Sequence, residues 1–463
     1  MGARPLFAGA SLALLLLGCS ANSGPASGAQ SALPLARPTS RHIKNVIVII
    51  QENRSLDNFF AGYPGANAPA TGCAAAQEAS KLDAGSGCPS GDVSVPLQKD
   101  TFENNPGARE HDWHSSMKDW DGGKMDGFAQ VGSSSYKYAA YAYIDRPELR
   151  PYWAMARQYV LADEMFPTEF GGSFTGHLTL VAGTDDLKPP SKAEVDFPTA
   201  GPYDCDSPPG TSSSYLLSNP YRKLRYNGPF PCFDQFNTMA QVLDGADISW
   251  KFYAITVLNA GMWEPFEAIK YVRYGTDWST NIVAPQTKIL SDAKHGRLPS
   301  VSWVTPSEED SDHPVAHSDR GPSWVASVVN AIGESAYWKN SAIVVVWDDW
   351  GGFYDNAAPP QLDYRGLGIR VPCLIISPYA KKGYVSHTQY EYGSILRFIE
   401  ETYGIPAGSI GPPSLGYTDG RANSLDDAFD FNQKPRTFSK ISSKYPATYF
   451  LREPPSNEPL DTQ

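Results

Sequence analysis

The stretch NVIVIIQENRSLDNFF, residues 45–60, decides the fold prediction. Its opening residues are almost all aliphatic and β-branched, and a continuous run of this kind is typical of a strand covered on both faces. The run ends on a carboxylate, an amide and a guanidinium, at Glu52, Asn53 and Arg54. A buried strand followed at once by polar side chains indicates that these side chains face a crevice at the edge of a sheet.

Further apolar runs predict three more buried strands and one weaker candidate. Apolar residues at helical spacing predict helices between them, and the last helix is expected to end at Gly404, with Pro406 beyond it. Strands that alternate with helices predict an α/β domain with a parallel sheet. The predicted strands are 45–51, 300–304, 342–347 and 373–377, with 248–254 the weaker one, and the predicted helices are 149–160, 323–332 and 394–403.

A second strand also ends in oxygen donors. Asp348 and Asp349 follow the strand at 342–347, as Glu52 and Asn53 follow the first strand. Two such strand ends form the group of ligands that a divalent cation requires, because one carboxylate alone cannot offset the cost of desolvating the ion. The alternative is that each pair caps a helix or a turn, as Asp and Asn often do. Both pairs together favour a metal site over capping.

A candidate nucleophile lies in EMFPTEFGGSFTGHLTLVAGT, residues 164–184, where Ser173 follows two glycines. A serine at a tight turn before a helix is held outward near amide dipoles that attract anions, although the same position suits a helix N-cap. The local sequence does not match the G-x-S-x-G motif of lipases. Coordination to a shared cation would instead favour the alkoxide of Ser173 without a catalytic triad. The oxygen-rich ligand set suits Mg²⁺, Ca²⁺ or Mn²⁺ somewhat better than Zn²⁺.

Histidines supply the remaining catalytic candidates. His313 follows a predicted strand, and His111 lies in REHDWHSSMKDWDGGKMDGF. An imidazole can stabilise an oxyanion or protonate a leaving group near neutral pH. We expect His177, His387 and Lys251 to contact the substrate, with the lysine supplying fixed positive charge. The alternative for Lys251 is an amine extended into solvent.

Composition and charge exclude several classes of protein. The sequence is 41% hydrophobic and 19% charged, as in globular proteins. Its formal net charge is −12 and it has no basic run, which argues against binding to nucleic acid or to anionic lipid. At 463 residues, the chain exceeds the usual size of one compact core, so we expect a large catalytic domain with insertions, or two domains.

The N-terminal residues 1–24, MGARPLFAGASLALLLLGCSANSG, are typical of an export signal. The LLGC ending is similar to a bacterial lipobox, which predicts lipidation of Cys19, and ordinary signal cleavage is the alternative. Residues 20–41, rich in Ser, Ala, Gly and Pro, are predicted to form a flexible linker. We therefore expect an exported protein, either a cell-envelope lipoprotein or a periplasmic or secreted one, with a membrane contact only through this anchor.

Export makes disulfides an expectation. Cys73 and Cys88 flank a Gly-, Ser- and Ala-rich loop, and Cys205 and Cys232 flank a second segment rich in Pro, Ser and Tyr. We predict that these local pairs form, each closing an insertion. Cys373 lies in the apolar run VPCLIISPY and is predicted to be a buried thiol rather than a nucleophile.

Six phrases along the chain carry a family resemblance: VIIQENRSLDNFF, DGGKMDGF, PSEEDSDHP, WDDWGGFYDN, RVPCLIISPYAKKGYVSH and GRANSLDDAFDF. They closely resemble the bacterial phosphoesterase family that includes phosphatidylcholine-hydrolysing phospholipase C and related acid phosphatases. The resemblance runs from about residue 42 to 432. It implies an alkaline-phosphatase-like α/β fold, in which helices flank a mostly parallel central sheet, and a single metal ion.

The resemblance also implies roles for individual residues. The nucleophile falls on Ser173 and the two catalytic histidines on His313 and His111. At the nucleophile the chain reads GGSFTGH, which is similar to the acid phosphatase branch, whereas phospholipase members often read GPT. Met117 stands where many relatives carry a second histidine. The family's metal ligands fall on Glu52, Asn53, Asp348 and Asp349, the four residues that follow the two strand ends.

These features predict a metal-dependent phosphoester hydrolase, an acid-phosphatase-like phosphomonoesterase that works through a phosphoserine intermediate. One alternative is a phospholipase C that cleaves phospholipid phosphodiesters. Another, of a different class, is a non-catalytic surface-binding lipoprotein with a structural metal. The expected cofactor is one divalent cation, Mg, Ca, Mn or Zn. The expected organisation is a signal at 1–19, a linker at 20–41, a catalytic domain at 42–440 and a tail at 441–463.

Overall fold

The computed structural model describes residues 42–75, 88, 92–103, 109–131, 138–187, 193–217 and 223–454. The chain divides into two compact units, Met1–Leu35 and Ala36–Gln463, and all described residues belong to the second. The predicted export signal, the linker and the last residues of the predicted tail lie outside the described residues.

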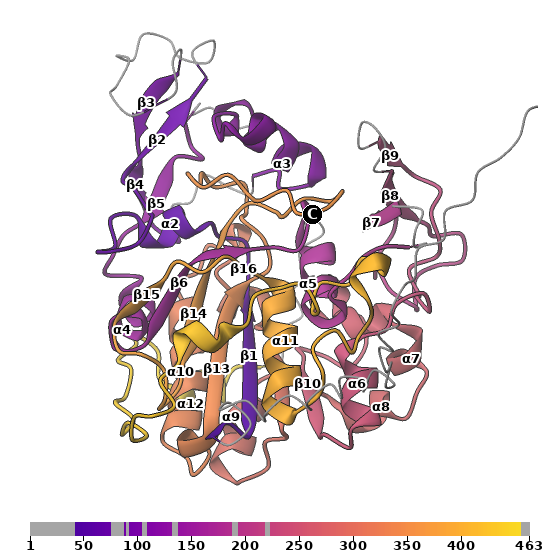
Figure 1. Cartoon of the computed structure of the whole chain (residues 1–463), viewed down its shortest axis with the longest axis vertical. Helices are drawn as coiled ribbons and strands as arrows, with labels where there is room; N and C mark the ends of the chain where they lie inside the picture. The colour runs from indigo at the N-terminus through magenta and orange to yellow at the C-terminus, as the bar shows by residue number, and fades with distance from the viewer. Residues whose placement is uncertain are drawn as a thin grey trace, which may run out of the picture. The chain divides into compact units, whose positions relative to one another are not determined.

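A nine-stranded sheet forms the centre of the described unit (Figure 1). Its strand order is β11-β10-β12-β1-β13-β14-β6-β15, and β16 pairs with β6 beside β15. Neighbouring strands are parallel except at β14, which runs antiparallel to both β13 and β6. The strands of this sheet are β1 (Asn45–Gln51), β6 (Val160–Phe166), β10 (Trp250–Tyr253), β11 (Ile282–Val283), β12 (Val301–Val304), β13 (Ser341–Trp347), β14 (Val371–Ile376), β15 (Tyr384–Ser386) and β16 (Tyr390–Glu391).

The structure confirms the mostly parallel α/β sheet and every predicted strand. The direction of β14 corrects the prediction, because a wholly apolar run shows that a strand is buried on both faces but carries no information about its direction. Strand β6 was missed. Asp163 and Glu164 interrupt its apolar pattern, and both side chains bond to groups that sequence alone does not place beside them.

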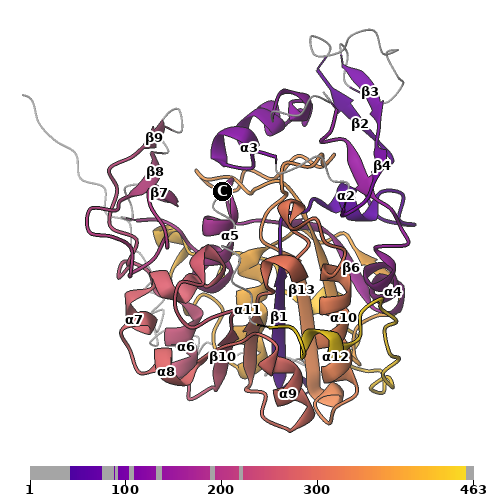
Figure 2. The same ribbon diagram turned by 180° about the vertical axis from the view of Figure 1, so that it is seen from behind.

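Helices cover both faces of the sheet. Helix α11 lies in front of the sheet in Figure 1, whereas α10 lies in front of it in Figure 2, which shows the molecule from behind. Helix α11 ends, as predicted, at Gly404, which adopts the left-handed conformation. The α-helices are α2 (Leu56–Phe60), α3 (Trp113–Trp120), α4 (Arg150–Gln158), α5 (Ser173–Ala182), α6 (Met239–Gly245), α7 (Lys270–Arg273), α8 (Asp277–Thr280), α9 (Lys288–Lys294), α10 (Gly321–Gly333), α11 (Tyr392–Tyr403) and α12 (Ala447–Phe450).

Three small sheets belong to insertions that lie beyond the carboxyl ends of the central parallel strands, together with α3 (Figure 1). Both predicted disulfides form, Cys73–Cys88 and Cys205–Cys232, and Cys373 is a buried free thiol. The small sheets pair β2 (Thr71–Ala74) with β3 (Val93–Pro96), β4 (Gln98–Asp100) with β5 (Ala142–Ile144), and β7 (Ala193–Pro198) with β8 (Ser213–Leu217) and β9 (Lys223–Arg225).

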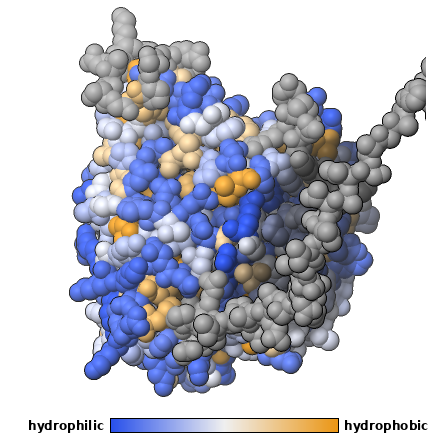
Figure 3. All heavy atoms as spheres, viewed as in Figure 1, coloured by the Kyte–Doolittle hydropathy of each residue, from blue (hydrophilic) through white to orange (hydrophobic). Residues whose placement is uncertain are grey.

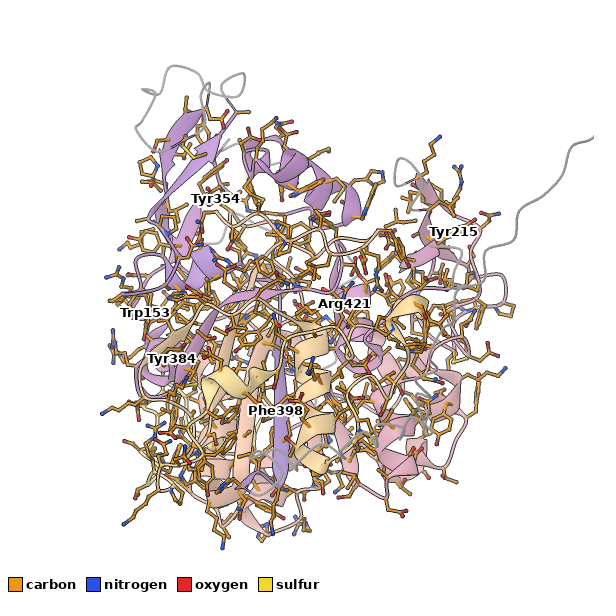
Figure 4. The ribbon with its side chains drawn as sticks, in the orientation of Figure 1. Trp153, Tyr215, Tyr354, Tyr384, Phe398 and Arg421 are labelled. Atoms are coloured by element: carbon orange, nitrogen blue, oxygen red, sulfur yellow. A yellow bond between two sulfur atoms is a disulfide. The ribbon has the colours of Figure 1, made fainter. Side chains whose placement is uncertain are left out.

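The first insertion packs on Tyr354, which comes from the loop after β13 and is labelled in Figure 4. The Tyr354 ring stacks on Tyr141 with ring centroids 4.7 Å apart, and its hydroxyl accepts a hydrogen bond from the Cys73 backbone N–H at 3.2 Å. A Cβ atom at Gly72 would lie 2.6 Å from the Tyr354 ring, so this close approach requires glycine.

The end of the described chain packs on the α10 side of the core. Ile441 and Phe450 are buried, and the Phe450 ring contacts Trp324 of α10 edge-on at 5.5 Å. The backbone N–H of Ile441 donates to the side-chain oxygen of Asn330. Part of the segment that sequence analysis placed in a tail therefore belongs to the folded unit.

Buried Arg370 joins three segments that meet at the site edge of the sheet. Its guanidinium donates to Asp355 Oδ1 at 2.9 Å, to Asp57 Oδ1 at 3.3 Å and to the backbone oxygen of Asp163 at 2.8 Å. Burial raises the pKa of Asp57 well above its usual value, and the arginine opposes that rise. The ion pairs hold the loop after β13 against α2, so they fix the segment that carries the Asp348–Asp349 pair.

We expect Arg370→Met to lower the free energy of unfolding by roughly 3–5 kcal/mol, because it leaves two carboxylates buried without their cation. Urea denaturation followed by tryptophan fluorescence measures this change. The triple variant Arg370→Met, Asp57→Asn, Asp355→Asn is expected to recover part of the loss. A single variant within 1 kcal/mol of the wild type would show that the ion pairs do not hold the loop.

Candidate active site

The pairing of β1 with β13 brings the two predicted ligand pairs together. Parallel register places Gln51 beside Trp347, so both strands end at the same level. The backbone N–H of Asn53 then donates to Asp348 Oδ1 at 2.9 Å. Asn53 adopts the left-handed conformation with φ 54°, which asparagine tolerates better than most residues. The side chains at both strand ends are completely or almost completely buried.

Three side chains at this edge form a candidate metal centre. Oxygen atoms of Glu52 and Asp348 and a ring nitrogen of His177 lie within 4.8 Å of one another, and all three side chains are buried. His177 Nε2 is 3.2 Å from Glu52 Oε1 and 3.7 Å from Asp348 Oδ2. Among the described residues, none donates a hydrogen bond to Asp348 Oδ2 or to Asn53 Oδ1. Two buried oxygens that receive no hydrogen bond from a described residue are suited to binding a cation.

His177, predicted to contact the substrate, lies beside Glu52 and Asp348. It lies four residues after Ser173 on α5, and residues at this spacing share one face of a helix. That face points at the two strand ends, so the imidazole meets Glu52 and Asp348. The candidate ligand set is therefore mixed nitrogen and oxygen, and it favours the softer divalent ions more than the oxygen-only set predicted from the sequence.

Ser173 is the first residue of α5, and its N-cap is Gly172, so the serine does not serve as the N-cap. Its Oγ donates to Asp349 Oδ2 at 3.2 Å and accepts a hydrogen bond from Asn53 Nδ2 at 3.4 Å. The hydroxyl is thus held between the two strand ends, beside the candidate metal ligands and at the positive end of a helix.

His111 and His313 lie beside the same group, with ring centroids 6.0 Å apart. His111 Nδ1 is 2.6 Å from the backbone oxygen of Arg109, and its Nε2 is 2.8 Å from Asn53 Nδ2. Because a carbonyl only accepts, Nδ1 carries a proton, and Nε2 accepts from the Asn53 amide. This pattern turns Asn53 Oδ1 away from His111. His111 therefore orients an amide at the site.

Asp312 anchors the segment that carries His313. Its Oδ2 accepts from the Tyr152 hydroxyl at 2.6 Å and from Trp347 Nε1 at 3.0 Å, and its backbone oxygen accepts from Arg54 Nε at 2.7 Å. Burial raises the pKa of Asp312 to about 7, against the effect of these partners. Arg54, the guanidinium at the end of the opening stretch, thus fixes the His313 loop rather than facing the crevice.

Lys251 and His387 are not brought to the site. Lys251 lies within β10, and its amine is 3.3 Å from Asp292 Oδ2 on α9. Register through β12 aligns it with Ile47, near the start of β1 and away from its carboxyl end. His387 follows edge strand β15, and its Nδ1 is 2.9 Å from Asp163 Oδ1. Residue type predicts substrate contact for both side chains, but it does not reveal their ion-pair partners.

Sequence reasoning missed Trp263, in the 3-10 helix η4 (Gly261–Trp263). Its buried ring lies 6.4 Å from the His177 ring and 6.2 Å from the His313 ring, between centroids. The loop after a parallel strand is a usual location for site residues, and this loop follows β10. That signal was present in the sequence, but a single tryptophan is more often part of a core.

A cavity of about 540 Å³ opens beside Gly172, the residue before Ser173. Gly172 and His111 lie among its lining residues, and the remainder comes from the start of α3 and from the β7–β8–β9 insertion. A larger cavity, about 870 Å³, lies between α9, α10 and residues 440–451, and no candidate site residue lines it.

Several curated proteins are similar to this chain. Phospholipase C A of Mycobacterium tuberculosis is 24% identical over 85% of this chain and 78% of its own length. Non-hemolytic phospholipase C of Pseudomonas aeruginosa is 24% identical over 80% of this chain and 55% of its own length. Non-specific phospholipase C5 of Arabidopsis thaliana is 23% identical over 78% of this chain and 70% of its own length.

Among solved structures, the chain is similar to a protein in the alkaline phosphatase superfamily from Vibrio parahaemolyticus. The TM-score is 0.38 with 11% identity, over 84% of this chain and 72% of that one. The model of the Phosphoesterase family matches residues 43–406, most of the chain. The protein belongs to the Phosphoesterase family and is a hydrolase that acts on phosphoric ester bonds.

Proposed function

We propose that this hydrolase cleaves a phosphoester through a covalent intermediate on Ser173, with the help of one divalent cation. The observation that carries the proposal is the position of the Ser173 hydroxyl, hydrogen-bonded to Asp349 and to Asn53 beside the Glu52, His177 and Asp348 cluster. Membership of a hydrolase family contradicts the alternative of a non-catalytic surface-binding lipoprotein.

The residues present fit a divalent cation. Glu52, Asp348 and His177 would hold it, together with the side-chain oxygens of Asn53 and Asp349, which lie at the same strand ends. When bound, the cation supplies positive charge that lowers the pKa of a nearby hydroxyl and polarises a phosphoryl oxygen. Its identity is open, because the ligand set combines carboxylates, an amide and an imidazole.

The chain's own groups supply the remaining chemistry. Asp349 Oδ2 accepts the hydrogen bond of Ser173 Oγ and is placed to take its proton as the oxygen attacks phosphorus. The phosphorus–oxygen bond to the alcohol then breaks, and His313 protonates the departing oxygen. Water later cleaves the phosphoserine. His111 keeps Asn53 oriented, which differs from the direct acid role that the sequence also allowed for it.

Two classes of substrate fit this site. The GGSFTGH sequence at the nucleophile supports a phosphomonoester, because it resembles the acid phosphatase branch. The second candidate is a phospholipid phosphodiester, as in a phospholipase C, and the names of the curated relatives favour it. Hydrolysis of a phosphomonoester and of phosphatidylcholine vesicles by the same metal-loaded preparation separates the two, since each assay responds to one class.

Export of the protein remains part of the proposal. Two disulfides in the described residues support an oxidising compartment, where such bonds persist. Within the described part of the chain, no helix combines the length and apolar character that a bilayer span needs. The lipid anchor on Cys19 stays a prediction.

Ser173→Ala is expected to lower kcat at least 1000-fold, because no other described hydroxyl is bonded to both Asn53 and Asp349. Metal content should stay near that of the wild type. Acid-quenched samples of the wild type should carry a phosphoryl group on the peptide that contains Ser173, seen by mass spectrometry. Ser327→Ala, the same change at a buried position of α10, is the matched control. Retained turnover in Ser173→Ala would remove the covalent mechanism.

The two histidines are expected to fail in different ways. His177→Ala should weaken metal binding at least 10-fold, because it removes one member of the ligand cluster. His313→Ala should keep its metal and lose kcat, with the largest loss for esters whose leaving alcohol has a high pKa. Elemental analysis and kinetics on esters of graded leaving-group pKa check both results. Full metal content in His177→Ala would return that residue to a substrate-binding role.

A further inference from the structure

The walls of the cavity beside Ser173 come from two insertions and not from the central sheet. Gly172, the residue before Ser173, and His111 are among its lining residues. One wall is the start of α3, and the other is the β7–β8–β9 sheet, which lies apart from α3 in Figure 1. The space-filling view shows the surface indented between these two parts (Figure 3). A phosphoester bound at Ser173 would extend its alcohol part into this space.

Carboxylates dominate the charge of this pocket. One of them is Asp196 of β7. Burial raises its pKa to about 6, and its Oδ2 accepts a hydrogen bond from Ser214 Oγ at 2.6 Å. Glu110 and Asp112 line the more exposed part, where His114 Nδ1 is 3.8 Å from Asp112 Oδ2. No lysine or arginine is found among the described lining residues. Above pH 7, the pocket therefore carries net negative charge.

Neighbouring Arg109 does not offset this charge. It is buried, outside the pocket lining, and its guanidinium lies 5.7 Å from the centre of the Phe353 ring. Burial lowers its pKa to about 10, and the carboxylates that act on it are Asp119 and Asp100, which are not pocket residues.

The rest of the lining suits a polyhydroxy compound. Ser214 and Thr199 offer hydroxyls, and Trp113 and Tyr226 offer aromatic surface for the CH groups of a sugar or polyol. Tyr226 keeps 67% of its surface exposed, so it is available to a ligand. Carboxylates and hydroxyls accept hydrogen bonds from alcohol groups, whereas a carboxylate on the ligand would meet like charge.

We propose that this pocket receives the alcohol part of the phosphoester and that Asp196 makes it select an uncharged polyhydroxy alcohol over an anionic one. The proposal rests on Ser173 being the site of phosphoryl transfer, and it adds the class of alcohol to the proposed function. Like charges about 6 Å apart near a protein surface repel by enough to change a binding constant at least 10-fold.

Glycerol 3-phosphate and 3-phosphoglycerate test the proposal, because they share one carbon skeleton and differ only by a CH₂OH group in place of a carboxylate. At pH 7.5, the wild type should show a kcat/KM at least 10-fold higher for glycerol 3-phosphate. Asp196→Asn should lower that ratio at least 5-fold. Asp112→Asn, at the exposed part of the pocket, should lower the same ratio by a smaller factor. This variant provides the test if Asp196→Asn does not fold.

Asp234→Asn is the matched control, since it also removes one negative charge, at an exposed residue outside the pocket that pairs with Lys270. Its ratio should equal that of the wild type. A wild-type ratio near 1, or a ratio that neither pocket variant changes, would overturn the proposal. A further pair, ethylene glycol phosphate and phosphoethanolamine, must not show a 10-fold preference for the amine, because that result would assign the pocket to cations instead.

Binding of the two esters to the metal-loaded Ser173→Ala protein tests the pocket assignment separately from the proposed hydrolysis at Ser173. Calorimetry should give at least 10-fold tighter binding of glycerol 3-phosphate than of 3-phosphoglycerate, and Asp196→Asn in that background should remove the difference. If the wild type cleaves neither ester while this binding preference holds, the proposed reaction fails and the pocket assignment stands. If Ser173-dependent turnover occurs without any preference, the pocket assignment fails alone.

Discussion

The parallel pairing of β1 with β13 is the constraint on which the site depends. In this register both strands end at one level, so the residues after Gln51 and after Trp347 meet. The hydrogen bond from the Asn53 backbone N–H to Asp348 then locks the two ends together. A slip of one residue would move each side chain to the opposite face of the sheet and scatter the ligands.

Two groups of buried acids are held in different ways. Away from the site, arginines pair with one group: Arg370 pairs with Asp57 and Asp355, and Arg365 pairs with Asp185. At the strand ends, the basic side chain beside Glu52 and Asp348 is His177, an imidazole that is also a metal ligand by nature. Burying the carboxylates of Glu52 and Asp348 is costly without a cation. A group of this kind therefore indicates a functional site rather than a purely structural ion pair.

The central sheet and the insertions contribute different parts of the candidate site. The sheet edge and α5 hold the candidate metal ligands and Ser173, where rigid elements fix their positions. The start of α3 and the β7–β8–β9 insertion build the walls of the cavity in front of those groups, and the Cys205–Cys232 disulfide closes part of the second wall. Such an arrangement allows the alcohol part of the substrate to change with the insertions while the phosphoryl chemistry stays with the sheet.

The sequence by itself determined five strands of the central sheet, the disulfide pairs and the location of the two candidate ligand pairs and of Ser173. Each of these leaves a local signal: an unbroken apolar run, a loop between cysteines, or polar residues at a strand end. Only the tertiary structure decided the direction of β14, the turn of His177 toward Glu52, and the pairing of Lys251 with Asp292 and of His387 with Asp163. These depend on which distant side chain lies opposite, and residue type and spacing do not contain that information.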